Sequence, residues 1–208
     1  MALQKKLLLF VLLLSVSACS VLAPENNTTK TRPQNLNNFP SQWSIHGRLS
    51  IINDKENWYA KFIWLQNNAD FQIRFMGPLG ETELLLIKKD QIIQLKTSSY
   101  ERSYTGNSEA LETLLLQETG WKFPINSLRF WSYGMPNPVV ETEIKYDESG
   151  YISDLYQQLW HVQYPKRIQV GEYYLPKKII VTEQNLKIKI VISQWDFNSS
   201  KQVKKNTG

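Results

Sequence analysis

The chain has 208 residues, of which 42% are hydrophobic, 12% aromatic and 21% charged. This size and composition fit one ordinary domain or two very small ones, and they exclude a large multidomain machine, a disordered polymer and a fibrous repeat. The formal charge of +5 falls to +3 (22 basic against 19 acidic residues) when residues 1–18 with Lys5 and Lys6 are set aside, an excess too small to indicate a nucleic-acid partner.

Residues 1–18 have the order of a secretory signal peptide: two lysines, an apolar run over residues 7–14, and then small residues. The run is much shorter than the roughly 20 residues that cross a bilayer. Cys19, the only cysteine, directly follows Ala18, and this sequence resembles the lipobox of bacterial lipoproteins, whose cysteine is lipid-modified and becomes the first mature residue. The alternative is a secreted protein whose cysteine merely lies near the cleavage site.

A multiply acylated Cys19 would anchor the protein firmly, because each buried methylene adds about 0.8 kcal/mol. The sorting pattern of such lipoproteins implies that Ser20, in place of aspartate, directs the protein to the outer membrane of a Gram-negative cell, where it would face the periplasm. Residues 19–40 contain many Asn, Thr and Pro residues and are predicted to be a flexible tether. Residues 198–208 are predicted to be a polar tail.

Residues 41–197 are predicted to form a mainly β domain, because apolar and polar residues alternate along most of this segment. Trp58, Phe62 and Trp64 share one face of a strand over residues 58–65, as do Phe71, Ile73 and Phe75 over residues 71–75. Trp43 lies in a first strand that also contains residues 47–49, and further strands are expected over residues 82–88, 91–96, 141–146, 152–157, 160–164, 167–170, 177–182 and 186–197. Turn signals between them, including Pro165, favour antiparallel neighbours.

Two segments have the spacing of short helices. Ser108 is a candidate cap for the first helix, which ends at Gly120, and the second is expected over residues 127–133. Their apolar residues are Leu111, Leu114 and Leu115 in the first and Leu128 and Trp131 in the second. About ten strands with one apolar face must close into a barrel or half-barrel. Periodicity alone leaves open whether the helices form a lid over a cavity or cap a solid core.

Several motifs occur in an order that resembles the LolB family of outer-membrane lipoprotein receptors. They are Trp43 with residues 47–49, residues 58–64, 75–84, 124–131 and 134–136, and residues 160–164. The most specific are Gly-Pro-Leu-Gly-x-Thr-Glu-Leu and Pro-x-Asn-Ser-Leu-x-x-Trp, and the likeness covers about residues 43–197. The resemblance implies an unclosed antiparallel β-barrel, or half-barrel, with a helical lid over an apolar cavity. It also implies a receptor that accepts the acyl chains of cargo lipoproteins from the periplasmic carrier LolA and inserts them into the outer membrane.

Leu79 matches the leucine that protrudes from a loop in this family and is needed for membrane insertion. Independently, Pro78 presets a turn and Gly80 permits a positive φ, so the Leu79 side chain could project outward on a rigid loop. Composition alone would favour a leucine folded back on the barrel edge. The family match favours the protruding arrangement.

The expected acyl-chain contacts are the inward residues of the strands and the apolar faces of the helices. They are Trp58, Phe62, Trp64, Phe71, Ile73, Phe75, Leu111, Leu114, Leu115, Leu128 and Trp131. Each could equally be an ordinary core residue. Because the sequence has no nucleotide-binding signature such as a P-loop, we expect passive transfer from the carrier to the bilayer.

Basic residues are expected on the outward faces of strands, where they keep a barrel soluble or attract an acidic partner. They are Lys88, Lys89, Lys96, Lys177, Lys178, Lys187 and Lys189. Arg48 and Arg74 are candidates for contacts with lipid headgroups at the cavity mouth.

A structural envelope lipoprotein with a solid barrel and no cargo is the main alternative to a receptor. An enzyme is not expected, because His46 and His161 are the only histidines and no Gly-x-Ser-x-Gly sequence is present. The small number of cysteine and histidine residues also leads us to expect neither a metal nor a cofactor. A monomer is the expected state, since a receptor with one cavity mouth requires no symmetry.

Overall fold

The computed structural model describes residues 39–197. The expected signal peptide, Cys19, almost all of the tether and the polar tail lie outside the described residues. The strands are β1 (Gln42–Ile52), β2 (Asn57–Asn67), β3 (Asp70–Met76), β4 (Thr82–Lys89), β5 (Ile92–Thr97), β6 (Glu101–Thr105), β7 (Thr142–Tyr146), β8 (Ile152–Gln157), β9 (Trp160–Val170), β10 (Tyr173–Glu183) and β11 (Leu186–Asp196). Helices α2 (Ser108–Thr119) and α3 (Ile125–Ser132) lie between β6 and β7.

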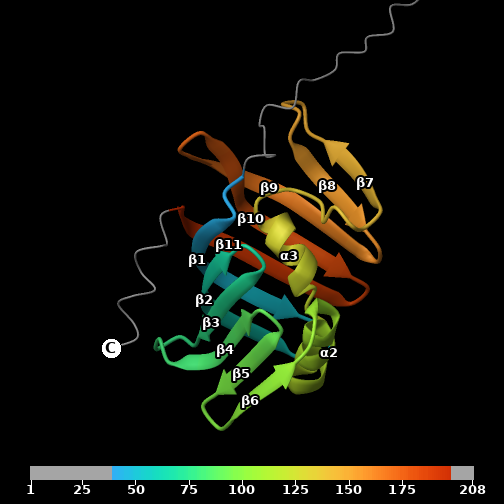
Figure 1. Ribbon diagram of the computed structural model, residues 1–208. Helices are drawn as coiled ribbons and strands as arrows, with labels where there is room; N and C mark the ends of the chain where they lie inside the picture. Colours follow the sequence, from blue (N-terminus) through green and yellow to red (C-terminus); the bar gives the residue numbers. More distant parts are fainter. Residues whose placement is uncertain (1–38, 198–208) are drawn as a thin grey trace, which may run out of the picture. The chain divides into compact units, whose positions relative to one another are not determined.

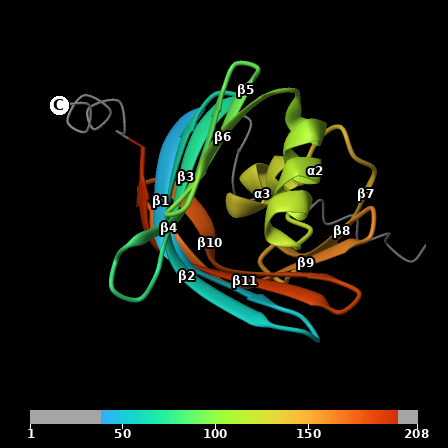
Figure 2. The same cartoon turned by 90° about the horizontal axis from the view of Figure 1, so that it is seen from below.

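The strands form one antiparallel sheet in the order β6-β5-β4-β3-β2-β1-β11-β10-β9-β8-β7. Pairing of β1 with β11 joins the two ends of the domain at the centre of the sheet, while β6 and β7 form its two edges. The sheet curves around both helices, which lie inside the curve (Figures 1 and 2). The prediction of a mainly β, unclosed barrel covered by short helices is therefore confirmed.

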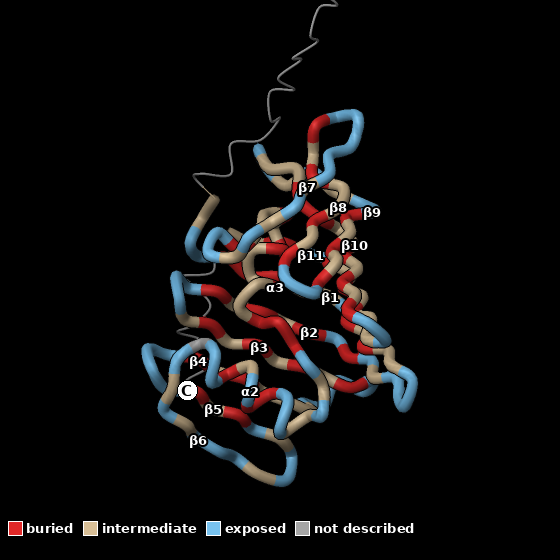
Figure 3. Tube along the Cα trace, turned by 90° about the vertical axis from the view of Figure 1, so that its right-hand side faces the viewer, coloured by how far each residue is buried: buried red, intermediate tan, exposed pale blue. Residues whose placement is uncertain are grey.

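Alternating burial along the strands positions the core on the concave face. On β2, Phe62 and Trp64 are buried while Tyr59 and Lys61 are exposed, and the same alternation recurs along the neighbouring strands (Figure 3). Gly47 permits an unusually close approach, because a Cβ atom there would lie 2.7 Å from the Phe62 ring and 2.4 Å from a backbone oxygen of β11. The aromatic residues of β2 can therefore pack directly on the backbone of β1.

The helices begin slightly earlier than the sequence pattern predicts. Asn107 is the N-cap of α2, and its side-chain oxygen accepts hydrogen bonds from the backbone N–H groups of Glu109 and Ala110 in the first turn. Helix α3 starts at Ile125, directly after Pro124, rather than at residue 127. Proline fixes its own φ near the helical value, so it can precede the first turn without interrupting it. None of the helices in residues 39–197 combines the length and apolar character needed to span a membrane.

The strands differ from the prediction in three places. Residues 160–164 and 167–170 form one continuous strand, β9. Pro165 does not interrupt it, because the register with β10 shifts at this point and the N–H group that proline lacks is not needed for pairing. Strand β10 starts at Tyr173, four residues before the predicted residue 177. Strand β6 was not predicted, since its sequence Glu-Arg-Ser-Tyr-Thr is polar, as suits a sheet edge.

The outward placement of Lys88 was also wrong. Lys88 pairs with inward-facing Phe71, so its side chain lies on the concave side and is buried. Its ammonium group donates hydrogen bonds to the backbone oxygens of Ala69, at 3.3 Å, and Asp90, at 3.0 Å. A long lysine stem near the end of a strand can thus cover apolar surface while its charge reaches the polar turn.

Candidate functional site

Two small cavities lie between the concave face of the sheet and the helices. Cavity A, of about 20 Å³, is lined by Ile51, Trp58, Phe75, Leu84, Leu86, Leu115, Thr119, Trp121 and Phe123. Cavity B, of about 10 Å³, is lined by Ile45, Leu49, Phe62, Trp64, Ile73, Phe75, Phe123, Leu128, Ser132 and Ile190. Each has room for about one water molecule. Phe75 and Phe123 border both cavities and meet edge to face, with ring centroids 6.3 Å apart.

A larger surface groove of about 560 Å³ lies at one end of the sheet, and we call it the end groove. It is lined by Asn53, Asp54, Lys55, Leu116, Gly120, Trp121, Lys122, Leu159, Glu183, Gln184, Asn185 and Leu186. Leu116 and Leu159 are 45% and 67% exposed, so apolar surface is available at the protein boundary. Trp121 lines both the end groove and cavity A. Trp121 therefore lies between the outer groove and the apolar interior.

The segment that carries Trp121 is fastened across this end of the sheet by polar contacts. The Trp121 indole N–H donates to Glu56 at 2.9 Å, and its ring lies 5.2 Å from that of Trp58. The neighbouring Lys122 ammonium group lies 2.6 Å from the buried carboxylate of Glu183. These partners belong to β10 and to the turn before β2, so the α2–α3 connection bridges both sides of the end groove.

The two helices are held in different ways. Near the end of α2, Glu118 accepts hydrogen bonds from Tyr100 at 2.8 Å, Tyr104 at 3.2 Å and Arg102, and the Tyr100 hydrogen bond contributes most to lowering the pKa of Glu118. These partners lie on or next to the edge strand β6. In α3, by contrast, the fully buried Trp131 donates to Gln157 at 2.7 Å.

Gln157 also joins the chain after α3 to the sheet. Its side chain accepts from the backbone N–H of Asn137 at 2.9 Å and donates to the backbone oxygen of Val140 at 3.0 Å. Because buried hydrogen bonds cost more to break than exposed ones, α3 is the more firmly anchored helix. Helix α2, whose polar contacts near its end reach the edge strand β6, is the helix that can separate from the sheet at lower cost.

Aromatic side chains fill the other end of the concave face, near the start of β1. Phe39 stacks on Tyr133 with centroids 4.3 Å apart, and it meets Tyr173, Trp195 and Phe197 edge to face. Burial raises the pKa of Tyr133 to about 12, so this phenol stays neutral at physiological pH. The end groove, which includes residues just after β1, lies at the opposite end of that strand.

All eleven predicted cavity residues lie on the concave face or on the helices, but only some line a cavity. Trp58, Phe75 and Leu115 line cavity A, and Phe62, Trp64, Ile73, Phe75 and Leu128 line cavity B. Phe71, Leu111, Leu114 and Trp131 are buried but line neither cavity. Trp121 and Phe123 were missed, and two aromatic residues in a five-residue connection between helices were the available signal.

Leu79 lies at the tip of the β3–β4 loop and is 95% exposed. The Gly80 N–H donates to the Gly77 oxygen at 3.0 Å, which closes a turn with Pro78 and Leu79 at its centre. Gly80 has a φ of +90°, a value that favours glycine. The loop projects on the side of the sheet away from the helices (Figure 2). The leucine is thus presented outward by a compact turn.

Other sequence candidates lie away from the cavities. Arg48 and Arg74 are on outward-facing positions of β1 and β3 and line neither the cavities nor the end groove, so their proposed placement at a cavity mouth was wrong. His161 lies 2.8 Å from Asp154 and stacks on Tyr156. Within residues 39–197, Asp154 is the side-chain partner of this histidine, and no serine hydroxyl is bound to it.

Comparisons with known sequences agree on one family. The family model for "Outer membrane lipoprotein LolB" matches residues 41–195. The chain is 30% identical over 153 residues to Outer-membrane lipoprotein LolB of Pseudomonas fluorescens, covering 74% of this chain and 73% of that protein. Its identity to Outer-membrane lipoprotein LolB of Stutzerimonas stutzeri is 27% over 171 residues, covering 79% and 82% of the two chains.

A solved Vibrio parahaemolyticus domain assigned to outer-membrane lipoprotein sorting shares the fold. Its TM-score is 0.52 at 11% sequence identity, with coverage of 77% of this chain and 86% of that one. The family model spans nearly the whole β domain, including the loop of Leu79 and both helices. The chain therefore belongs to the LolB family of outer-membrane lipoproteins.

Proposed function

We propose that this protein is a receptor, anchored to the outer membrane through Cys19 and facing the periplasm of a Gram-negative cell. It accepts lipoproteins from the carrier LolA, holds their acyl chains between the helices and the concave face, and passes them into the outer membrane. One observation carries the proposal: cavities A and B follow one another behind Trp121, which itself lines the end groove. Once the cavities widen, this series would give a fatty chain an apolar path from the surface to the centre of the fold.

The cavities must widen before they can hold a chain, because each now has room for about one water molecule. Helix α2 and the connection bearing Trp121 would move away from the sheet, exposing Leu111, Leu114 and Leu115 to the incoming chain. Re-exposing three buried leucines costs roughly 5–9 kcal/mol, while burying about 14 methylenes contributes roughly 11 kcal/mol. These opposing amounts are similar, so the cargo is held only weakly and can be released.

Exposed Leu116 and Leu159 lie where a chain would first meet the protein, on the rim of the end groove. Trp121 must then turn aside, which breaks its hydrogen bond to the exposed Glu56. An exposed hydrogen bond of this kind is readily replaced by water. Transfer needs no nucleotide in this scheme, since each step moves the acyl chain to a site of lower free energy.

The decisive experiment measures uptake of a fluorescent acyl probe by the delipidated protein, followed by transfer from cargo-loaded carrier without nucleotide. Saturable uptake is expected, and Leu115→Trp should weaken it by filling cavity A. Gln117→Trp is the matched control, because this exposed residue of α2 lines neither the cavities nor the end groove. Circular dichroism establishes that both variants fold. No saturable uptake by the wild type would favour the structural lipoprotein with a solid barrel.

A further inference from the structure

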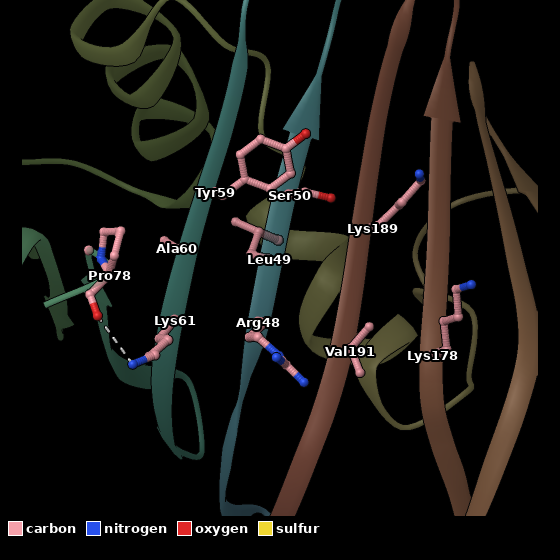
Figure 4. A pocket seen from close by; sticks show the side chains of 11 residues that line it. Arg48, Leu49, Ser50, Tyr59, Ala60, Lys61, Pro78, Lys178, Lys189 and Val191 are labelled. Atoms are coloured by element: carbon pink, nitrogen blue, oxygen red, sulfur yellow. Dashed lines mark hydrogen bonds between the residues drawn. The ribbon is translucent and has the colours of Figure 1, made fainter. Parts of the chain in front are cut away.

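The convex face of the sheet carries a second groove, of about 380 Å³, on the side away from the helices. It is lined by Arg48, Leu49, Ser50, Tyr59, Ala60, Lys61, Gly77, Pro78, Lys178, Lys189 and Val191, and we call it the basic groove (Figure 4). Its four cations come from β1, β2, β10 and β11, which are neighbours in the sheet. None of its residues lines cavity A or the end groove, and Leu49 alone also lines cavity B.

The sheet register brings like charges together in this groove. Arg48 on β1 is directly opposite Lys61 on β2. On the other side of β1, Val191 of β11 pairs with Arg48 and also with Lys178 of β10, so these two cations flank the same residue. Like charges directly opposite one another in an antiparallel sheet reduce stability. An anion bound in the groove would relieve this repulsion.

The protein provides few counter-charges for these cations. Strands β1, β2, β10 and β11 contain only two acidic residues, Glu183 and Asp196, and each is the last residue of its strand. Within residues 39–197, none of the four groove cations forms an ion pair. Glu81, in the adjoining loop, and Glu83, on β4, lie against Gly77, and Glu83 accepts a hydrogen bond from Trp58 at 3.0 Å.

The basic groove is continuous with the loop that presents Leu79. Gly77 and Pro78 line the groove, and the Lys61 ammonium group lies 3.5 Å from the Pro78 backbone oxygen. An exposed apolar tip beside a set of cations is the arrangement that lets a protein sit at a membrane surface: the apolar group enters the acyl region and the cations meet phosphates.

We propose that the basic groove binds the phosphate groups of anionic phospholipids and so orients the protein on the membrane with Leu79 directed into it. This inference rests on one part of the proposed function, the contact of Leu79 with the membrane, and it requires no cargo. Each cation held near an anionic surface contributes about 1 kcal/mol, which is roughly fivefold in binding. The attraction falls off within a Debye length, about 8 Å at physiological ionic strength, so it is sensitive to salt.

The test uses the full lipidated protein anchored in vesicles, so that the anchor holds it equally on every membrane. A membrane-impermeant acylating reagent labels accessible lysines, and mass spectrometry measures the labelling of Lys61, Lys178 and Lys189. Vesicles of phosphatidylethanolamine with phosphatidylglycerol should reduce this labelling severalfold compared with vesicles of phosphatidylethanolamine and phosphatidylcholine. High salt should abolish the difference, and Lys96 on β5 should be labelled equally in both membranes.

Two further arms identify the source of the anion. Inorganic phosphate added to neutral vesicles should not protect the groove lysines, and protection by phosphate alone would overturn the membrane assignment. Protection that appears only when the carrier is added would assign the groove to an acidic protein partner instead. Equal labelling in both membranes without carrier would also overturn the proposal.

A double variant, Arg48→Gln with Lys189→Gln, should decrease the protection of Lys61 and Lys178, whereas Lys96→Gln with Lys145→Gln should leave it unchanged. Uptake of the acyl probe should be unaffected by either pair, because the groove lies on the opposite face of the sheet from the cavities. If the wild type took up no acyl probe, the receptor function would be contradicted, but the protection of the groove lysines would still be expected. The two proposals can therefore fail separately.

Discussion

Replacing Leu79 with glutamate should block delivery to the membrane while leaving the fold intact. The side chain is 95% exposed, so Leu79→Glu removes almost no packing from the folded protein. The turn is closed by a backbone hydrogen bond between Gly80 and Gly77, which the substitution does not touch. We therefore expect an unchanged thermal unfolding midpoint and unchanged uptake of an acyl probe.

The effect on delivery follows from what the tip does at the bilayer. Burying a leucine side chain contributes roughly 1.5–3 kcal/mol, so its loss should weaken membrane engagement about 10- to 150-fold. A carboxylate adds a desolvation penalty to that loss. Leu79→Ala keeps the tip apolar but smaller, so its defect should be intermediate between those of the wild type and Leu79→Glu.

The assay loads each variant with labelled lipoprotein and follows transfer into vesicles by a change in fluorescence. Val139→Glu is the matched control, because Val139 is another exposed apolar residue, 88% accessible, on a different loop. If Leu79→Glu delivered cargo as fast as the control, insertion of the loop into the membrane would be refuted. Loss of delivery by both variants would mean that the assay reports surface charge in general.

Three other changes test the interior. Phe75→Ala should join cavities A and B at a cost of about 3–5 kcal/mol in stability, and myristate should raise its melting temperature more than that of the wild type. Glu118→Ala should accelerate acyl uptake in stopped-flow experiments by freeing the end of α2, whereas Glu109→Ala should not. Burial raises the pKa of Glu112 in the folded protein. The free energy of unfolding should therefore fall as the pH rises from the pKa of the unfolded chain through the raised pKa of the folded protein. Glu112→Gln should flatten that decline, as measured by urea denaturation between pH 4 and pH 8.

The amino-acid pattern was sufficient to predict most of the strands and the inward faces of β2 and β3. Phe62 and Trp64 were placed correctly because one face of each strand must be apolar wherever a sheet covers a single core. The turn of Leu79 was also predictable, because Pro78 and Gly80 restrict the backbone locally. Both predictions depend on interactions within a few residues of the chain.

Features that depend on register could not be predicted in the same way. Arg48 and Lys61 are thirteen positions apart in the sequence and become direct neighbours only through the pairing of β1 with β2. Lys88 was misplaced because its charge outweighed its position: it continues the inward phase of Leu84 and Leu86 without interruption. The size of the interior was equally hidden, since the same apolar residues can enclose a cavity or fill it.

The small volume of cavities A and B bears directly on how cargo would be released. A permanently open cavity would bury an acyl chain at no cost in rearrangement, and at about 0.8 kcal/mol per methylene it would retain that chain against the bilayer. Here the closed protein already buries Leu111, Leu114 and Leu115 against the sheet. In the function proposed above, α2 would return to these contacts when the chain leaves and would recover the free energy lost on opening. Closure of the protein on its own core would therefore favour release, and the membrane that receives the chain would set the direction of transfer.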